Sequence, residues 1–317
     1  MILEKGVVVH PDEVTGFWRD TFLQTDLRLL GIHPVGGAGS HGRVKKLAEE
    51  GLPAESRDHL ATLKRAGVGI EYELHVMSLL LPRELFARHP EYFRTDEKGG
   101  RNPDLNCCAS NPDALEIVAE NAARLARALP SSTHRYSFWL DDARSGICRC
   151  PACASLSAAD QALLVYNAVE RGIRRADPLG RQSYLAYCGA SELPARVTPE
   201  DGIYLEYAPF DRDPTLPMTH SGNAPSAKNA RELAAFFGAK EGKVLEYWLD
   251  NSKYSGWKKP PKKLVPDPDV IRRDLDFYDL LGFRTATTFA CFLGEDYEAL
   301  WGKPDLGGYA VPRQAGD

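Results

Sequence analysis

The chain lacks the features of a membrane protein and of a nucleic-acid-binding protein. None of its apolar runs approaches the roughly 20 residues that a membrane span needs. The formal net charge of its 317 residues is −5, so there is no basic field to attract nucleic acid. Met1–Lys5 leads directly into the strand-like Gly6–His10, and we expect no signal peptide. A cytoplasmic protein without nucleic-acid or membrane partners is predicted.

Two common site motifs are also missing. The glycine run at residues 36–39 lacks the GxGxxG spacing, and we expect no helix to open on it, which argues against a nucleotide loop. His10 is followed by Pro-Asp and not by the His-x-His of amidohydrolase-type metal enzymes. No organic cofactor is expected.

What the chain does have is a regular alternation of strand-like and helical segments. A helix is expected over Phe17–Leu30, and Gly189–Asp201 is too short and proline-rich for a good one. The strand-like segments are Val7–His10, Arg28–Val35, Val68–His75, His134–Leu140, Ser183–Cys188, Gly202–Glu206, Val244–Leu249 and Phe283–Phe289. This pattern predicts a single (β/α)8 TIM barrel over residues 1–317 with one degenerate helix. The rival architecture is an open doubly wound sheet.

Loop lengths favour a barrel enzyme. The joins from helix to strand are short, whereas joins from strand to helix are long, as in Val76–Ser110 and Ala143–Ala159. Barrel enzymes build their sites from the strand-to-helix loops. The pair Asp141-Asp142 ends the fourth strand, and like charges so close are expected to raise the pKa of one of them.

Carboxylates and aromatic residues gather at the predicted strand ends, which is typical of a carbohydrate site. Glycoside hydrolysis needs one carboxylic acid to protonate the leaving oxygen and a second group to attack or stabilise the anomeric carbon. We predict a retaining, exo-acting glycoside hydrolase that takes an oligosaccharide or glycoside. Asp142 is the predicted acid, and Glu206 or Glu246 is the predicted nucleophile or base, an arrangement that includes α-glucuronidase-like enzymes. The substrate-binding candidates are His10, Glu73, His75, Tyr207, Trp248, Asp250, Asn251 and Trp257. A non-catalytic carbohydrate-binding barrel is the alternative from another class.

Four segments resemble a family of glycoside-hydrolase-like barrels, the domain of unknown function 4838. They are YELHVMSLLLPRELFARHPEYFR, CCASNPDALEIVAENAARLA, YSFWLDDARSGICRCPAC and LEYWLDNSKYSGWKKPPKKL. The likeness covers most of the chain from about residue 60 onward. It implies a TIM-barrel relative of the glycosidases.

A weaker likeness is mechanistic. The Asp-Asp pair, followed later by Asp-Asn after a tryptophan-containing strand, is similar to the O-GlcNAcase-type β-N-acetylglucosaminidases. That likeness implies that Asp141 orients a substrate acetamido group for attack on C1, while Asp142 is general acid and base. Asp250 and Asn251 would then bind hydroxyl groups.

Seven cysteines include the cluster Cys148-Arg-Cys150-Pro-Ala-Cys153. The two-residue spacing is that of a zinc knuckle, and Cys148 adds a third thiolate. Either Cys107 or Cys108 is positioned to supply the fourth ligand, and the family resemblance points to Cys108. We therefore predict one structural Zn²⁺ per chain, in a loop region of residues 105–108 and 148–153, with a closed coordination shell that leaves no position for water.

Overall fold

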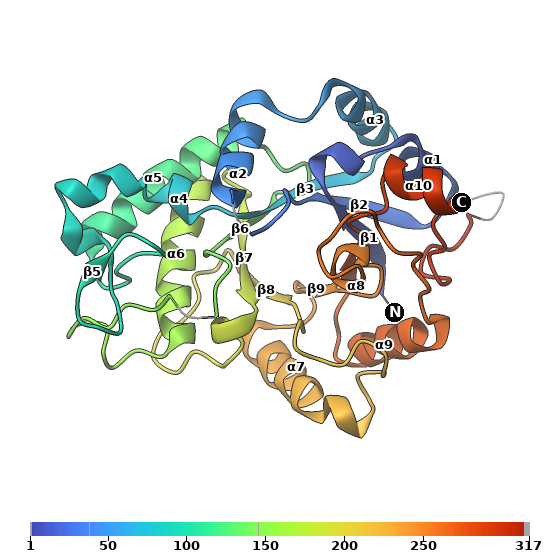
Figure 1. Ribbon diagram of the computed structural model, residues 1–317. Coiled ribbons are helices and arrows are strands. Elements are labelled where there is room, and N and C mark those ends of the chain that lie inside the picture. The colour runs from blue at the N-terminus through green and yellow to red at the C-terminus, as the bar shows by residue number, and fades with distance from the viewer. Residues whose placement is uncertain (1, 38, 145, 314–317) are drawn as a thin grey trace. The chain divides into compact units, whose positions relative to one another are not determined.

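A computed structural model describes residues 2–37, 39–144 and 146–313. In that part of the chain, eight strands close into a parallel barrel in the order β1, β10, β9, β8, β7, β6, β3, β2 (Figure 1). Their bounds are β1 Glu4–Val9, β2 Leu27–Ile32, β3 Gly69–His75, β6 Arg135–Trp139, β7 Arg181–Ala186, β8 Ile203–Tyr207, β9 Lys243–Glu246 and β10 Thr285–Phe289. The predicted (β/α)8 TIM barrel is confirmed, and the open sheet is excluded.

Helices follow most of the strands. They are α1 Gly16–Gln24, α2 Ser40–Glu50, α3 Ala54–Arg65, α4 Met77–Leu80, α5 Pro112–Ala128, α6 Ala158–Ala176, α7 Ala224–Phe237, α8 Asn251–Tyr254, α9 Pro268–Leu280 and α10 Glu295–Trp301. The predicted degenerate element is confirmed, because only a 3-10 turn at Cys188–Ala190 lies between β7 and β8 in the described chain. A search of the described helices for one that is both long and apolar enough to span a membrane finds none.

The chain divides into two compact units. The terminal unit comprises Met1–Pro34, Gly51–Glu71 and Tyr207–Asp317, and the central unit comprises Val35–Glu50 and Tyr72–Glu206. The organisation of residues 1–317 as one catalytic domain stays a prediction.

In the central unit, α5 and α6 pack against each other. A Cβ atom added to Gly172 of α6 would lie 2.0 Å from the backbone oxygen of Ala119 in α5, so only glycine fits at this contact. Asn111 caps α5 by accepting from the N–H of Ala114, and Ser157 forms a capping box with Asp160 at the start of α6. These caps fix where each helix begins, immediately after the long loops.

In the terminal unit, β1 pairs with β2 on one side and with β10 on the other. The buried ammonium group of Lys243 in β9 lies 3.0 Å from the carboxylate of Glu71 in β3, so the two charges compensate each other. The Tyr309 hydroxyl donates to the carbonyl oxygens of Gly6 and Ala286 and thereby joins the C-terminal segment to β1 and β10.

Two expectations for local structure were wrong. The helix expected over Phe17–Leu30 ends at Gln24, and Leu27–Ile32 forms β2, a strand with five buried positions. A helix does follow the glycine run, since α2 begins at Ser40. Ala38, within that run, lies outside the described residues.

Candidate functional site

Asp141 is a buried, ion-paired carboxylate just beyond the end of β6. Its Oδ2 lies 2.7 Å from Arg83 Nη2 and accepts from the N–H of Asn106 at 2.6 Å, while its Oδ1 lies 3.5 Å from His41 Nε2. Burial alone would raise the pKa of Asp141, but His41, Arg83 and the Asn106 N–H together hold that pKa below its usual range. Asp141 is therefore a fixed anion.

Asp142 has the opposite environment. Its side chain is exposed, and its Oδ1 accepts a hydrogen bond of 3.1 Å from the Tyr187 hydroxyl. Burial of Tyr187, reinforced by the charge of Asp142, raises the pKa of the phenol, so the tyrosine stays a donor. The sequence predicted that repulsion between the two like charges would raise the pKa of one acid, but the pKa of Asp141 is lowered. The two adjacent acids instead differ in burial and in partners.

Glu206 and Glu73 lie in the buried part of the central unit. Glu206 Oε2 accepts from Ser137 Oγ and from Trp139 Nε1, both at 2.9 Å. Glu73 pairs in register with Ser137 across β3 and β6, and both carboxylates are fully buried. Because Ser137 and Trp139 belong to β6, the strand that presents Asp141 and Asp142 also orients Glu206.

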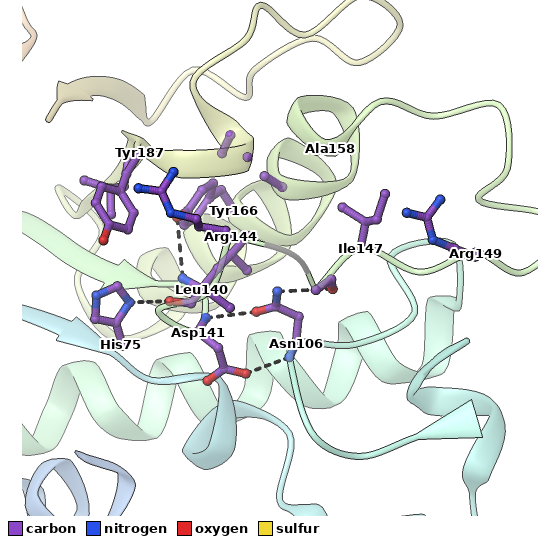
Figure 2. Close-up of a pocket in the computed structure, with 16 residues that line it drawn as sticks. His75, Asn106, Leu140, Asp141, Arg144, Ile147, Arg149, Ala158, Tyr166 and Tyr187 are labelled. Carbon is purple, nitrogen blue, oxygen red and sulfur yellow. Dashed lines mark hydrogen bonds between the residues drawn. The ribbon is translucent and has the colours of Figure 1, made fainter. Parts of the chain in front are cut away.

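Beside Asp141 lies a pocket of about 170 Å³ (Figure 2). His75 lines one side, where its Nδ1 lies 2.5 Å from the Leu140 carbonyl oxygen. The other lining residues include Asn106, Arg144, Tyr187 and three positions of α6, namely Ala158, Ala162 and Tyr166. Of the predicted site residues in the central unit, His75 and Asp141 line this pocket, whereas Asp142, Glu73 and Glu206 do not. Asp142 is hydrogen-bonded to Tyr187, which does line the pocket.

Glu246, in the terminal unit, lies in a buried polar cluster packed on α9. Arg212 lies 3.1 Å from Glu246 and 2.6 Å from Asp274, and Tyr278 donates to Glu246 at 2.5 Å. The predicted site residue Trp248 belongs to the same cluster, since its Nε1 donates to Asp274. Burial, and next the charge of Glu246, raise the pKa of Asp274 to about 6.

The other predicted residues of the terminal unit have structural contacts. Asp250 caps α8 by accepting from two backbone N–H groups, and Asn251 donates to the carbonyl oxygen of Lys262. The Tyr207 hydroxyl donates to the Ser226 carbonyl oxygen. Trp257 differs from these, because 63% of its surface is exposed.

His10 lies at the end of β1 in a group of three potential metal donors. The others are Glu13 and Cys291, and the ligand atoms of all three lie within 4.8 Å of one another. The Phe292 N–H donates to both oxygens of Glu13. Burial raises the pKa of Glu13 to about 8, although Lys259 opposes this effect. We assign no metal to this group.

The four cysteines predicted to bind zinc come together in the central unit. The sulfur atoms of Cys108, Cys148, Cys150 and Cys153 all lie within 4.8 Å of one another, and all four residues are buried. Cys107 does not belong to this cluster. The neighbouring cysteine Cys108 is therefore the one that the fold brings to the knuckle.

Sequence reasoning missed the residues that hold the two acids: His41, Arg83, Asn106 and Tyr187. His41, Arg83 and Asn106 contact Asp141 although they lie 35 to 100 positions from it in the sequence. No local sequence pattern could therefore have identified them. Tyr187 directly follows β7, and the rule that barrel sites form at strand ends could have identified it.

The fold is a (β/α)8 barrel, and solved structures of several glycosidases have a similar fold. The β-galactosidase from Bacillus circulans sp. alkalophilus is similar with a TM-score of 0.54 at 11% identity, over 90% of this chain and 50% of that one. The β-galactosidase from Rahnella sp. R3 has a TM-score of 0.50 at 12% identity, over 90% and 50%. Endo-glycoceramidase II from Rhodococcus sp. has a TM-score of 0.50 at 10% identity, over 91% and 73%. The chain thus spans about half the length of these two β-galactosidases, and at such identities the likeness shows the fold alone.

The particular family is established by sequence. The chain belongs to the family described as domain of unknown function (DUF4838), whose model matches residues 54–285. No curated protein sequence matches the chain. The family resemblance drawn from its motifs is therefore confirmed.

Proposed function

We propose that the protein is a glycoside hydrolase in which Asp142 is the general acid. The observation that carries this assignment is the contrast between two adjacent carboxylates: Asp141 is buried and ion-paired with Arg83, whereas Asp142 is exposed and hydrogen-bonded to Tyr187. Two carboxyl groups in unlike environments take unlike protonation roles. Asp142 is exposed next to the pocket and can donate a proton to a glycosidic oxygen, whereas the Asp141 carboxylate is already bound by Arg83, Asn106 and His41.

Glu206 is the second carboxylate of the proposed mechanism. It lies on β8, which is separated from β6 by one strand, and Ser137 and Trp139 orient its Oε2. In this role it attacks the anomeric carbon or activates the water that does so. The retaining, exo-acting outcome remains part of the proposal.

The environment of Asp141 favours this form over a substrate-assisted one. An acetamido N–H could bind Asp141 only by competing with Arg83, Asn106 and His41 for the same carboxylate. We therefore assign Asp141 to holding the loop that presents Asp142. Equal hydrolysis of glucoside and N-acetylglucosaminide substrates would support this choice, and a strict acetamido requirement would reject it.

The terminal-unit residues that hold the barrel together are assigned to the scaffold. Glu246 is paired with Arg212 and Tyr278, and Asp250 and Asn251 form caps and backbone links. The pocket suits a small ligand: at about 30 Å³ per water molecule, a volume of about 170 Å³ holds roughly six waters.

The deciding experiment compares Asp142→Asn with the parent on aryl and alkyl glycosides. The substitution keeps the shape and removes the titratable proton, so kcat/KM, which reports cleavage of the glycosidic bond, should fall by about 10²–10⁴ on alkyl glycosides. It should fall much less on dinitrophenyl glycosides, whose leaving group needs no proton. Asp201→Asn, an exposed acid in the turn before β8, is the matched control and should keep full activity.

Two outcomes would reject the proposal. An equal loss on both leaving groups would show that Asp142 does not protonate the leaving oxygen. Sugar binding without hydrolysis of any glycoside in a broad panel would instead support the non-catalytic carbohydrate-binding barrel.

A further inference from the structure

We infer that Cys108, Cys148, Cys150 and Cys153 bind one structural zinc ion. The sulfur of Cys108 lies 3.6 Å from that of Cys150 and 3.9 Å from that of Cys153. Four thiolates at Zn–S distances of about 2.3 Å in a tetrahedron stand roughly 3.8 Å apart. These two sulfur–sulfur distances are close to the edge length of a zinc–thiolate tetrahedron.

A disulfide does not explain the cluster. All seven cysteines are free, and a disulfide needs an S–S distance of about 2.05 Å. Four buried sulfur atoms at non-bonded distances, brought from two loops about 40 positions apart in sequence, instead surround a point that a cation of thiolate preference would fill.

The surroundings of the cluster supply the donors that thiolates need. The Thr95 N–H donates to Cys148 at 3.3 Å, and the Ser110 hydroxyl lies 3.1 Å from the sulfur of Cys153. The guanidinium group of Arg101 lies 3.9 Å from Cys148. Four thiolates around Zn²⁺ carry a net charge of −2. The positive charge of Arg101 offsets part of this negative charge.

The backbone of the knuckle is fixed from α6. Gln161 accepts from the N–H of Cys148 at 2.8 Å and donates to the carbonyl oxygen of the same residue at 3.1 Å. The N–H of Cys153 donates to the Cys150 carbonyl oxygen, which closes the turn between the two ligands. These hydrogen bonds fix the backbone of the knuckle against α6.

The ion would join the two loops that frame the pocket. Cys108 follows Asn106 by two residues and Cys148 follows Gly146 by two, and the Asn106 side chain donates to the Gly146 carbonyl oxygen at 3.3 Å (Figure 2). Since Asn106 also binds Asp141, zinc would set the position of the loop that carries Asp142. This last consequence rests on the proposed function, whereas the zinc site itself does not.

Metal content tests the site without any assay of hydrolysis. Purified parent protein should hold about one zinc per chain, and Cys108→Ser and Cys150→Ser should each hold less than about a tenth of that amount. Cys107→Ser is the matched control, because Cys107 is the buried neighbour of a ligand but lies outside the cluster. It should keep its zinc.

Substitution of the metal by cobalt tests the site in the parent protein, even if the serine variants do not fold. Parent protein reconstituted with Co²⁺ should show the intense thiolate-to-metal absorption and tetrahedral ligand-field bands of four-sulfur coordination. Parent protein without zinc, protein that holds iron in its place, or equal zinc in Cys107→Ser and Cys108→Ser would each overturn the site. Intact zinc content together with an Asp142→Asn enzyme that keeps full activity on alkyl glycosides would reject the proposed function and leave the zinc site standing.

Discussion

Asp141 and Asn106 bind each other through two reciprocal hydrogen bonds. The backbone N–H of Asn106 donates to the Asp141 carboxylate at 2.6 Å, and the backbone N–H of Asp141 donates to the Asn106 side-chain oxygen at 2.9 Å. Arg83 contacts both residues, since it pairs with Asp141 and donates to the Asn106 carbonyl oxygen at 2.7 Å. The three side chains therefore fix one loop against the other, and of the three only Asp141 was singled out from the sequence.

Asn106 adopts a left-handed backbone with φ of 43°. We predict that Asn106→Gly loses the side-chain hydrogen bonds but keeps this backbone, and is destabilised by about 1–2 kcal/mol. Asn106→Ala should lose a further ~1 kcal/mol because alanine resists a positive φ. Urea unfolding of both variants measures the difference, and equal stability would contradict the role of the backbone.

The low pKa of Asp141 predicts a stability dependence in acid. A depressed folded-state pKa contributes stability above the unfolded value of about 3.8, and that contribution is lost as the pH falls through the folded value. Asp141→Asn should therefore be less stable than the parent by about 3 kcal/mol at pH 7, since Arg83 loses its partner. The gap should close as the pH falls below about 4. A stability difference between parent and variant that stays constant down to pH 2 would show that the pKa of Asp141 is not lowered.

The raised pKa of Glu13 predicts the opposite dependence of stability on pH. Its pKa is raised to about 8, so the folded protein keeps a proton that the unfolded chain loses between about pH 4.5 and 8, and stability falls as the pH rises through this window. Glu13→Gln should remove this fall and be more stable than the parent at pH 9 by roughly 2–5 kcal/mol. The exposed Glu49→Gln serves as control, and its urea midpoints at pH 5, 7 and 9 should parallel those of the parent.

The cluster around Arg212 predicts a large loss on truncation. Arg212→Met would leave the buried carboxylates of Glu246 and Asp274 without their cation, and should cost about 3–5 kcal/mol. Arg272→Met, on the exposed side of α9 with its own two aspartates, should change stability by less than about 1 kcal/mol. Similar losses of stability for the two variants would show that burial does not strengthen the ion pairs of Arg212.

The barrel could be predicted because its strands are short apolar runs separated by turn signals. The errors fell where that signal is weak. α2 follows a glycine run and buries only Val44 and Leu47, so its sequence reads as a polar loop. Leu27–Ile32 continues the apolar pattern of α1, and only the tertiary partner β1 shows that it is a strand.

The site could be predicted only in part, for a physical reason. Both faces of β9 carry polar residues: Lys243 is paired with Glu71, and Glu246 is paired toward α9. Hydropathy cannot tell which of the two faces lines the barrel. The location of Asp141 and Asp142 at a strand end was predictable, whereas their unlike partners depend on contacts between distant loops.

The register of β1 has a consequence for synthesis on the ribosome. Glu4–Val8 pairs with Thr285–Phe289, so one edge of the first strand stays unpaired until almost the whole described chain has been made. At 5–20 residues per second, that interval lasts roughly 15–60 s. An apolar strand edge exposed for so long is a template for pairing with other nascent chains. We therefore expect the nascent chain to be more prone to aggregation than the closed, mature barrel.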